Sequence, residues 1–160
     1  MAITNKPQFT QGKKVEAFLD ELFQHEGWTV CPMGGYDERV LHLGDRFFVK
    51  GTTVLKIEYK SGIQTFHTGN VFLETVSVDT QRKPGWVYTC QADFIMYAAL
   101  LNGKILVFKP QALRDRIEYL KNKFREVKTS NHQNDGYDTF GVIVPLDYAE
   151  RQLAEKVIAL

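Results

Sequence analysis

Apolar and polar residues alternate most clearly over residues 53–60. Successive side chains of a strand point to opposite faces of a sheet, so this pattern predicts a strand with its apolar residues on one face and Glu58 beside Lys60 on the other. The sequence Lys50-Gly51-Thr52 predicts a tight turn before that strand. The preceding segment would then pair antiparallel with it and bring Asp45 beside Glu58. The pattern therefore predicts a hairpin that gathers two carboxylates and an amine.

Apolar residues at intervals of three and four predict amphipathic helices elsewhere in the chain. Gly27 follows the first of them, and Thr89 is suited to cap the second. Residues 1–12 are polar and contain Pro7 and Gly12, which favours a flexible arm. The predicted helices cover residues 13–26, 90–101, 111–127 and 146–160.

Short apolar runs bounded by glycine, proline or polar residues predict the remaining strands. These runs cover residues 28–31, 71–78, 104–108 and 140–144. The order of helices and strands predicts an α/β fold with a mixed sheet flanked by helices. A chain of 160 residues with 44% apolar content is long enough for one domain with a real core. We expect an arm at 1–12, a core at 13–110 and a C-terminal extension at 111–160.

Charge and cysteine content limit the partners and the compartment. The formal net charge is +1, so any basic surface for nucleic acid must be local. Cys31 and Cys90 do not suggest a disulfide scaffold, which favours a reducing, cytoplasmic setting. The longest apolar run, 94–101, is too short to span a bilayer, and the N-terminus lacks an apolar signal core. We therefore expect no membrane partner.

Two carboxylates that converge beside an ammonium group can hold a hard cation and activate a water molecule. Mg²⁺ prefers one or two carboxylates together with waters and substrate phosphates, and a nearby ammonium offsets developing negative charge. Asp37 is a rival for the first carboxylate, but its spacing to Glu58 is longer and it lies at the edge of a loop. We therefore prefer Asp45 as the first carboxylate. The alternative is that Asp45 is an ordinary solvated acid at the end of a strand.

Asp45, a gap of twelve residues and then Glu58-Tyr59-Lys60 resemble the D…ExK signature of the PD-(D/E)XK nuclease superfamily. This superfamily includes restriction endonucleases and Holliday junction resolvases. Gly44 stands where the signature usually has proline. The run Thr89–Tyr97 resembles the T-x-x-A-D-x-x-x-Y element that follows the catalytic strands of the superfamily. A second ExK, Glu126–Lys128, falls at the end of a predicted helix and is not preferred.

The resemblance implies a restriction-endonuclease-like α-β-β-β-α-β core, here followed by a strand and a helix. It implies a deoxyribonuclease, most simply an endonuclease that uses Mg²⁺ or Mn²⁺ to hydrolyse DNA. Asp45 and Glu58 would bind the metal together with the backbone carbonyl of Tyr59, and Lys60 would position or help deprotonate the attacking water. Paired cuts on a duplex call for two active sites, so a homodimer is expected.

Two further acids are candidates for an accessory role. Glu16 occupies the place of a glutamate that the superfamily often carries on its first helix, although a solvated acid on that helix is an equal alternative. Glu74 follows Thr68-Gly69-Asn70 on an apolar strand, as in small phage and bacterial relatives of the superfamily. A carboxylate on an apolar face is costly unless it is paired or bound, which favours a role at the site. Asp93 is expected to brace a loop or favour a helix start.

The segment 104–128 holds eight Lys or Arg residues and three acids, which makes it the best candidate for a surface that contacts phosphates. The alternative is a solvated helix face with ion pairs between successive turns. The candidate nucleic-acid-binding residues are Arg82, Lys83, Lys104, Lys109 and Arg114.

Other functional classes have weaker support in the sequence. The chain lacks both G-x-x-x-x-G-K-[ST] and H-E-x-x-H, the motifs of nucleotide-binding loops and zinc proteases. Two alternatives remain open. One is a non-catalytic nucleic-acid-binding or regulatory protein on the nuclease fold, because a fold does not guarantee its chemistry. The other is a protein-interaction domain.

Overall fold

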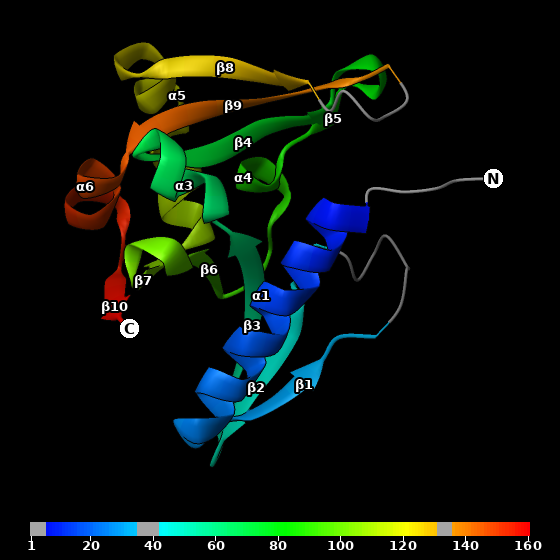
Figure 1. The fold of residues 1–160 in the computed structure, drawn as a ribbon, viewed down its shortest axis with the longest axis vertical. Helices are drawn as coiled ribbons and strands as arrows, with labels where there is room; N and C mark the ends of the chain where they lie inside the picture. The colour runs from blue at the N-terminus through cyan, green and yellow to red at the C-terminus, as the bar shows by residue number, and fades with distance from the viewer. Residues whose placement is uncertain (1–5, 35–41, 131–135) are drawn as a thin grey trace.

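The computed structural model describes residues 6–34, 42–130 and 136–160. Its largest element is a mixed six-stranded sheet in the order β1-β2-β3-β6-β7-β10 (Figure 1). Neighbouring strands are antiparallel except β3 and β6, which are parallel. The strands are β1 (Thr29–Pro32), β2 (Arg46–Lys50), β3 (Thr53–Ser61), β6 (Phe94–Ala99), β7 (Lys104–Phe108) and β10 (Lys156–Ala159).

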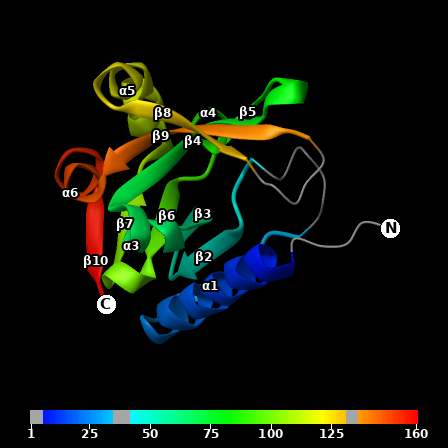
Figure 2. The same ribbon diagram turned by 45° about the horizontal axis from the view of Figure 1, so that its top comes forward.

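A second, antiparallel sheet has four strands in the order β5-β4-β9-β8. Helix α1 lies along one side of the six-stranded sheet, and the second sheet and α5 lie toward the other side (Figure 2). The strands of the second sheet are β4 (Asn70–Val78), β5 (Lys83–Pro84), β8 (Arg125–Ser130) and β9 (Asp138–Pro145). The helices are α1 (Lys6–His25), α3 (Ile63–Thr68), α4 (Trp86–Thr89), α5 (Pro110–Lys123) and α6 (Leu146–Tyr148), with short helical turns at Asp79–Gln81, Leu100–Asn102 and Ala149–Leu153.

The first hydrophobic core joins α1 to one face of the six-stranded sheet. Leu19 and Phe23 recur at the helical interval, so both side chains are buried against the sheet. The ring of Phe23 lies 5.0 Å from that of Phe48 on β2. Ile57 and Tyr59 of β3 complete this face of the core. The apolar stripe of the helix and the odd-numbered residues of β3 therefore pack as their sequence pattern predicts.

The second core fills the space between the other face of the six-stranded sheet, α5 and the second sheet. Its members come from β6, β7, α5, β4 and β9, among others. Strands β6 and β7 thus have cores on both faces, and nearly every residue in them is buried. Strands of this kind are almost continuously apolar, without the alternation that marks a half-exposed strand.

This double burial explains why the predicted helix at 90–101 is wrong. The segment forms the short helix α4 before Cys90 and then the strand β6. A continuous apolar run cannot be assigned to a helix or a buried strand by periodicity alone. Asp93 braces strand β3, and not a loop or a helix start as expected: its Oδ2 accepts a hydrogen bond from Lys56 N at 2.7 Å, and its own N–H donates to Lys56 O at 2.8 Å.

Three other boundaries also need correction. Helix α1 begins at Lys6, so the predicted arm at 1–12 is wrong from that residue onward. Helix α5 ends at Lys123, and the second ExK lies in strand β8 instead of at a helix end. The predicted helix at 146–160 stops at Leu153, and β10 follows and pairs with β7. The C-terminal extension therefore ends in a strand of the main sheet.

The predicted hairpin is confirmed. Strands β2 and β3 pair antiparallel from Lys50↔Thr53 to Arg46↔Ile57, around Gly51 at φ +60°. The predicted strands at 28–31, 71–78, 104–108 and 140–144 also correspond to β1, β4, β7 and β9. No helix in the described ranges has the length and apolar character needed to cross a membrane.

Candidate functional site

The candidate site lies where the β2–β3 hairpin opens. The ladder ends at Arg46↔Ile57, and the Asp45 N–H donates one more hydrogen bond to Ile57 O at 2.8 Å. Beyond that point, Asp45 Oδ2 accepts a hydrogen bond from the Tyr59 N–H at 2.7 Å. The side chain of Asp45 thus replaces the next backbone acceptor of the ladder, which fixes its carboxylate against β3.

The carbonyl of Tyr59 is directed toward the same place. In a strand, the N–H and C=O of one residue point to the same side, and successive residues alternate between sides. Ile57 O and Tyr59 N both bond to Asp45, whereas Lys56 N and O bond to Asp93 on the opposite side of β3. The Tyr59 carbonyl therefore points toward the Asp45 carboxylate.

Glu58 and Lys60 share the other side-chain face of β3 and form an ion pair. Lys60 Nζ lies 2.6 Å from Glu58 Oε1, and the two side chains are 28% and 11% exposed. The low exposure means that solvent screens this pair little. The sequence predicted that Glu58 and Lys60 emerge together, and this prediction is confirmed.

The electrostatics of the pair follow from its burial. Burial raises the pKa of Glu58, Lys60 lowers it, and the charges of Asp45 and Glu16 raise it further, with a net upward shift. Burial alone would lower the pKa of Lys60, but Glu58, Asp45 and Glu74 raise it above its ordinary value. Lys60 therefore stays an ammonium ion in a cluster that holds more carboxylates than cations.

Glu74 on β4 belongs to the same cluster. Its Oε1 accepts a hydrogen bond from the Trp86 N–H at 3.3 Å, and burial raises its pKa while Lys60 opposes that shift. Lys60 Nζ lies 5.8 Å from the centre of the Trp86 ring, within the range of a cation–π contact. The structure thus brings the second sheet and the start of α4 to the hairpin, and no pattern in the sequence indicates that Trp86 belongs to this site.

Glu16 is engaged by Arg46, a residue that the sequence analysis missed. Arg46 Nη2 lies 3.2 Å from Glu16 Oε2, its Nε donates to Asp20 Oδ1 at 3.0 Å, and its Nη1 donates to the Asp45 carbonyl at 3.0 Å. The Tyr59 hydroxyl also donates to Asp20 Oδ1 at 3.0 Å. This network ties α1 to the backbone of Asp45. Glu16 acts on the pKa of Glu58 through its charge.

We expect the Glu58→Gln variant to be more stable than the wild type at neutral pH. The amide has the same shape but removes the buried charge, and we expect a gain of about 1 kcal/mol, or roughly 2–4 °C in Tm. Thermal melts of both proteins over a pH series measure this difference in stability. Below pH 4.5, the ordinary value for glutamate, the wild-type carboxyl is protonated both folded and unfolded, so the two proteins should converge. As pH rises through the raised folded-state pKa, the wild type should lose stability relative to the variant.

A lower Tm for Glu58→Gln at neutral pH would contradict this expectation. It would mean that the pairing of Glu58 with Lys60 stabilises the fold more than burial of the carboxylate destabilises it. The Glu126→Gln variant is the control, because Glu126 belongs to the second ExK and accepts a hydrogen bond from Thr75 at 2.9 Å. The pH-dependent divergence expected for Glu58→Gln should be absent there, because Glu126 is exposed to solvent whereas Glu58 is buried.

The candidate phosphate-binding residues differ in their partners. Lys104 and Lys109 lie at opposite ends of β7, and each pairs with an acid from the C-terminal segment, Glu150 at 2.7 Å and Glu155 at 3.0 Å respectively. These acids lie outside the segment 104–128, so counting charges within that segment overestimates its local positive charge.

The other three candidates differ from the lysines. Arg114 binds neutral oxygens, and its Nη1 donates to the Cys90 carbonyl at 2.6 Å. Arg82 ends a helical turn in the left-handed conformation at φ 51°, and Lys83 follows it on β5, where its charge lowers the pKa of Glu74 and so opposes the larger effect of burial.

Asp37, the rival metal ligand, lies outside the described residues. Cys31 and Cys90 are both free thiols, as the sequence predicts.

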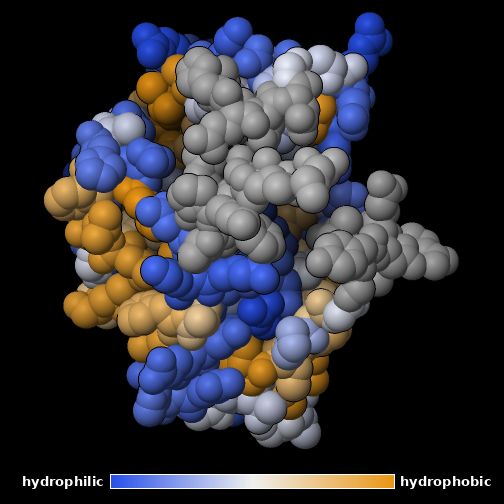
Figure 3. All heavy atoms as spheres, turned by 45° about the vertical axis from the view of Figure 1, so that its right-hand side comes forward, coloured by the Kyte–Doolittle hydropathy of each residue, from blue (hydrophilic) through white to orange (hydrophobic). Residues whose placement is uncertain are grey.

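On the face shown in Figure 3, hydrophobic residues gather in patches between areas of hydrophilic residues. A shallow, largely apolar hollow lies between α1 and α3, and Val15, Phe18, Ile63 and Leu100 contribute to its lining.

Comparison of the chain with protein-family models, with curated proteins and with solved structures gives no match.

Proposed function

We propose that the chain is a metal-dependent nuclease that hydrolyses phosphodiester bonds of DNA, and that it acts as an endonuclease. The observation that carries this proposal is the convergence of Asp45, Glu58, Lys60 and the Tyr59 carbonyl at the open end of one hairpin. The sequence resemblance to the PD-(D/E)XK superfamily assigns a role to each of these four groups. Their spacing in the chain and their convergence in space are separate observations that agree.

The order of the elements supports the same proposal. Helix α1 is followed by three antiparallel strands, β1 to β3, and then, after helical segments, by β6 parallel to β3. This is the order expected of an α-β-β-β-α-β core, with β4 and β5 inserted between the third and fourth strands. The insertion carries Glu74, which adds a carboxylate beside Lys60.

The donor atoms at the site suit Mg²⁺ or Mn²⁺. Asp45 has a second carboxylate oxygen beside the one bonded to the Tyr59 N–H, Glu58 has a second beside the one paired with Lys60, and the Tyr59 carbonyl supplies a third oxygen. Hard cations of this kind take oxygen ligands, and Mg²⁺ keeps several waters beside one or two carboxylates. A group of three His, Cys, Asp or Glu side chains that could hold a metal does not occur within the ranges described. The proposed site therefore has two carboxylates and relies on backbone, water and substrate for its other ligands.

Lys60 has a defined task in this proposal. Burial lowers its pKa, but the neighbouring carboxylates Glu58, Asp45 and Glu74 raise it above its ordinary value, which favours a role as a proton donor over a role as the base that deprotonates water. Its ammonium group can instead donate a hydrogen bond to the water or to a phosphate oxygen and offset the negative charge that develops there. A bound Mg²⁺ supplies Lewis-acid activation of water and phosphate. The Glu58–Lys60 ion pair and the neighbouring Trp86 ring hold the amine in position.

A plasmid-nicking assay tests the proposal. With Mg²⁺ or Mn²⁺ the wild type should convert supercoiled DNA to nicked or linear DNA, and Glu58→Ala should not. Glu126→Ala is the matched control, because Glu126 belongs to the same ExK pattern. Since Glu126 lies on a different sheet, this variant should cut like the wild type. Salt-sensitive retention of DNA without cleavage would favour the non-catalytic binding protein instead. A wild type that neither cuts nor retains DNA would favour the protein-interaction domain.

The proposal includes a homodimer, in which each copy supplies one active site for one strand of a duplex. Light scattering on the eluting peak of a sizing column measures the mass directly. A mass of one chain, together with linearised plasmid as a product, would require the two cuts to come from separate binding events.

A further inference from the structure

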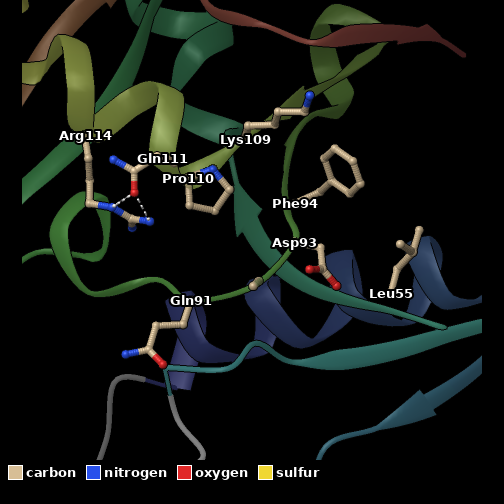
Figure 4. Close-up of a pocket in the computed structure, with 9 residues that line it drawn as sticks. Leu55, Gln91, Asp93, Phe94, Lys109, Pro110, Gln111 and Arg114 are labelled. Atoms are coloured by element: carbon tan, nitrogen blue, oxygen red, sulfur yellow. Dashed lines mark hydrogen bonds between the residues drawn. The ribbon is translucent and has the colours of Figure 1, made fainter.

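A hollow of about 560 Å³ lies between the start of α5, the connection leading into β6 and strand β3. Figure 4 shows Lys109, Gln111 and Arg114 on one side of it, with Asp93, Phe94 and Leu55 on the other. Its volume is within the range of sites that hold small molecules.

The guanidinium of Arg114 is fixed in place without being neutralised. Its Nε and Nη2 donate to Gln111 Oε1 at 3.3 and 3.2 Å, and its Nη1 donates to the Cys90 carbonyl at 2.6 Å. All of these acceptors are neutral. A guanidinium has five N–H donors, so two remain for another acceptor. Such a group is preorganised to bind an oxyanion, and phosphate suits its planar fork.

The opposite wall of the hollow offers apolar surface. Phe94 and Leu55 are both half-buried, and the ring of Phe94 lines the space opposite Pro110 (Figure 4). Gln91 is exposed at the edge and can both donate and accept hydrogen bonds. Lys109 on this lining is already paired with Glu155 at 3.0 Å, so Arg114 is the cation of the hollow that no carboxylate of the described residues neutralises. An aromatic ring and an arginine in one hollow are the combination that holds single-stranded nucleic acid, with a base on the ring and a phosphate on the cation.

The hollow and the candidate site are separated by one short segment of chain. The Gln91 N–H donates to the His42 carbonyl at 2.6 Å, and a Cβ on Gly44 would lie 3.4 Å from the Ala92 side chain. The segment that lines the hollow thus packs directly against the chain that leads into Asp45. Burial raises the pKa of the Cys90 thiol to about 11, and the charges of Glu58, Lys60 and Arg114 also act on that pKa, which agrees with a position of Cys90 between the two sites.

We propose that the hollow binds one unpaired nucleotide of the DNA strand, with its phosphate at Arg114 and its base against Phe94. The inference rests on the proposed function for its choice of nucleic acid, and it narrows the substrate to DNA with a single-stranded segment near the bond to be cut. A paired and stacked base cannot present its face to the Phe94 ring, so a nucleotide must leave the stack to enter.

Binding in EDTA tests this inference without any cleavage. Fluorescence anisotropy of a short labelled oligothymidylate should give an affinity about 10-fold weaker for Phe94→Leu and for Arg114→Gln than for the wild type. Phe94→Tyr keeps the ring and should bind like the wild type, which separates loss of stacking from loss of folding. Phe66→Leu and Arg151→Gln are controls on exposed residues away from the lining and should not change the affinity.

Three results would overturn the inference. The first is unchanged oligothymidylate binding in Phe94→Leu and Arg114→Gln while melting curves show both variants to be folded. The second is a blunt duplex that binds as tightly as the single strand and depends on the same two residues. Wild-type protein that nicks plasmid but does not bind oligothymidylate would sink the inference and leave the nuclease proposal standing. Oligothymidylate binding that depends on Arg114 and Phe94, in a protein that cuts no plasmid, would support the inference about the hollow and contradict the nuclease proposal.

Discussion

Replacing Lys60 by methionine is expected to lower the rate of plasmid cleavage about 10²- to 10³-fold. Methionine preserves most of the side-chain length but removes the charge that offsets the negative phosphate. It also leaves Glu58 buried without the cation that lies 2.6 Å away. Single-turnover cleavage with Mg²⁺ at saturating enzyme measures the effect on the chemical step. DNA binding in EDTA should change much less, because one of several cations is lost.

The chain contains its own control for this variant. Lys128 ends the second ExK, on β8, where its Nζ pairs with Asp138 at 3.0 Å and is half-exposed. Lys128→Met should cut at the wild-type rate, since exposed ion pairs contribute little. Equal losses in the two variants would show that the assay reports general damage or loss of charge. Wild-type cleavage by Lys60→Met would remove Lys60 from the reaction.

Replacing Gly44 by proline is expected to destabilise the protein by about 3 kcal/mol or more. This change would introduce the proline that usually precedes the aspartate in the signature that residues 45–60 resemble. Gly44 has φ +126°, whereas proline is confined to about −65°. A Cβ at this position would also lie 2.7 Å from the Ile57 carbonyl, closer than real side chains approach. We therefore expect the introduced proline to damage the approach to Asp45.

Urea or thermal unfolding followed by circular dichroism measures the loss. Gly12→Ala is the matched control, because Gly12 lies within α1 and nothing is within 4 Å of its added Cβ. That variant should gain about 0.5–1 kcal/mol, since alanine favours a helix over glycine. A Gly44→Pro protein as stable as the wild type would contradict the backbone conformation described at the approach to Asp45.

The hairpin was predictable because its determinants are local. Alternation over residues 53–60 and a turn at Gly51 specify strand pairing over a few residues, and they place Asp45, Glu58 and Lys60 together. Strand β6 was not predictable in this way. Its two faces meet different cores, so no alternation remains in its sequence, and the missing polar face led to its assignment as a helix.

The rest of the candidate site depends on contacts between distant segments. Trp86 reaches Lys60 and Glu74 only because the second sheet folds back on the hairpin. Arg46 joins α1 to the chain beside Asp45, and neither its neighbours nor its spacing indicates this role. Lys104 pairs with Glu150, which is 46 residues away, so a local count of charges could not show that it was already paired. For Arg46 and Lys104, the sequence shows the charge but not the partner, because each acidic partner lies far away along the chain.

The position of a bound metal tests the central claim most directly. Crystals of the protein grown with Mn²⁺ should give an anomalous difference peak bounded by the Asp45 carboxylate, the Glu58 carboxylate and the Tyr59 carbonyl, and the peak should be lost in Asp45→Asn. An experimental structure in which Asp45 and Glu58 point away from each other, or in which Mn²⁺ binds elsewhere and not between them, would contradict the proposed metal site and the nuclease mechanism built on it.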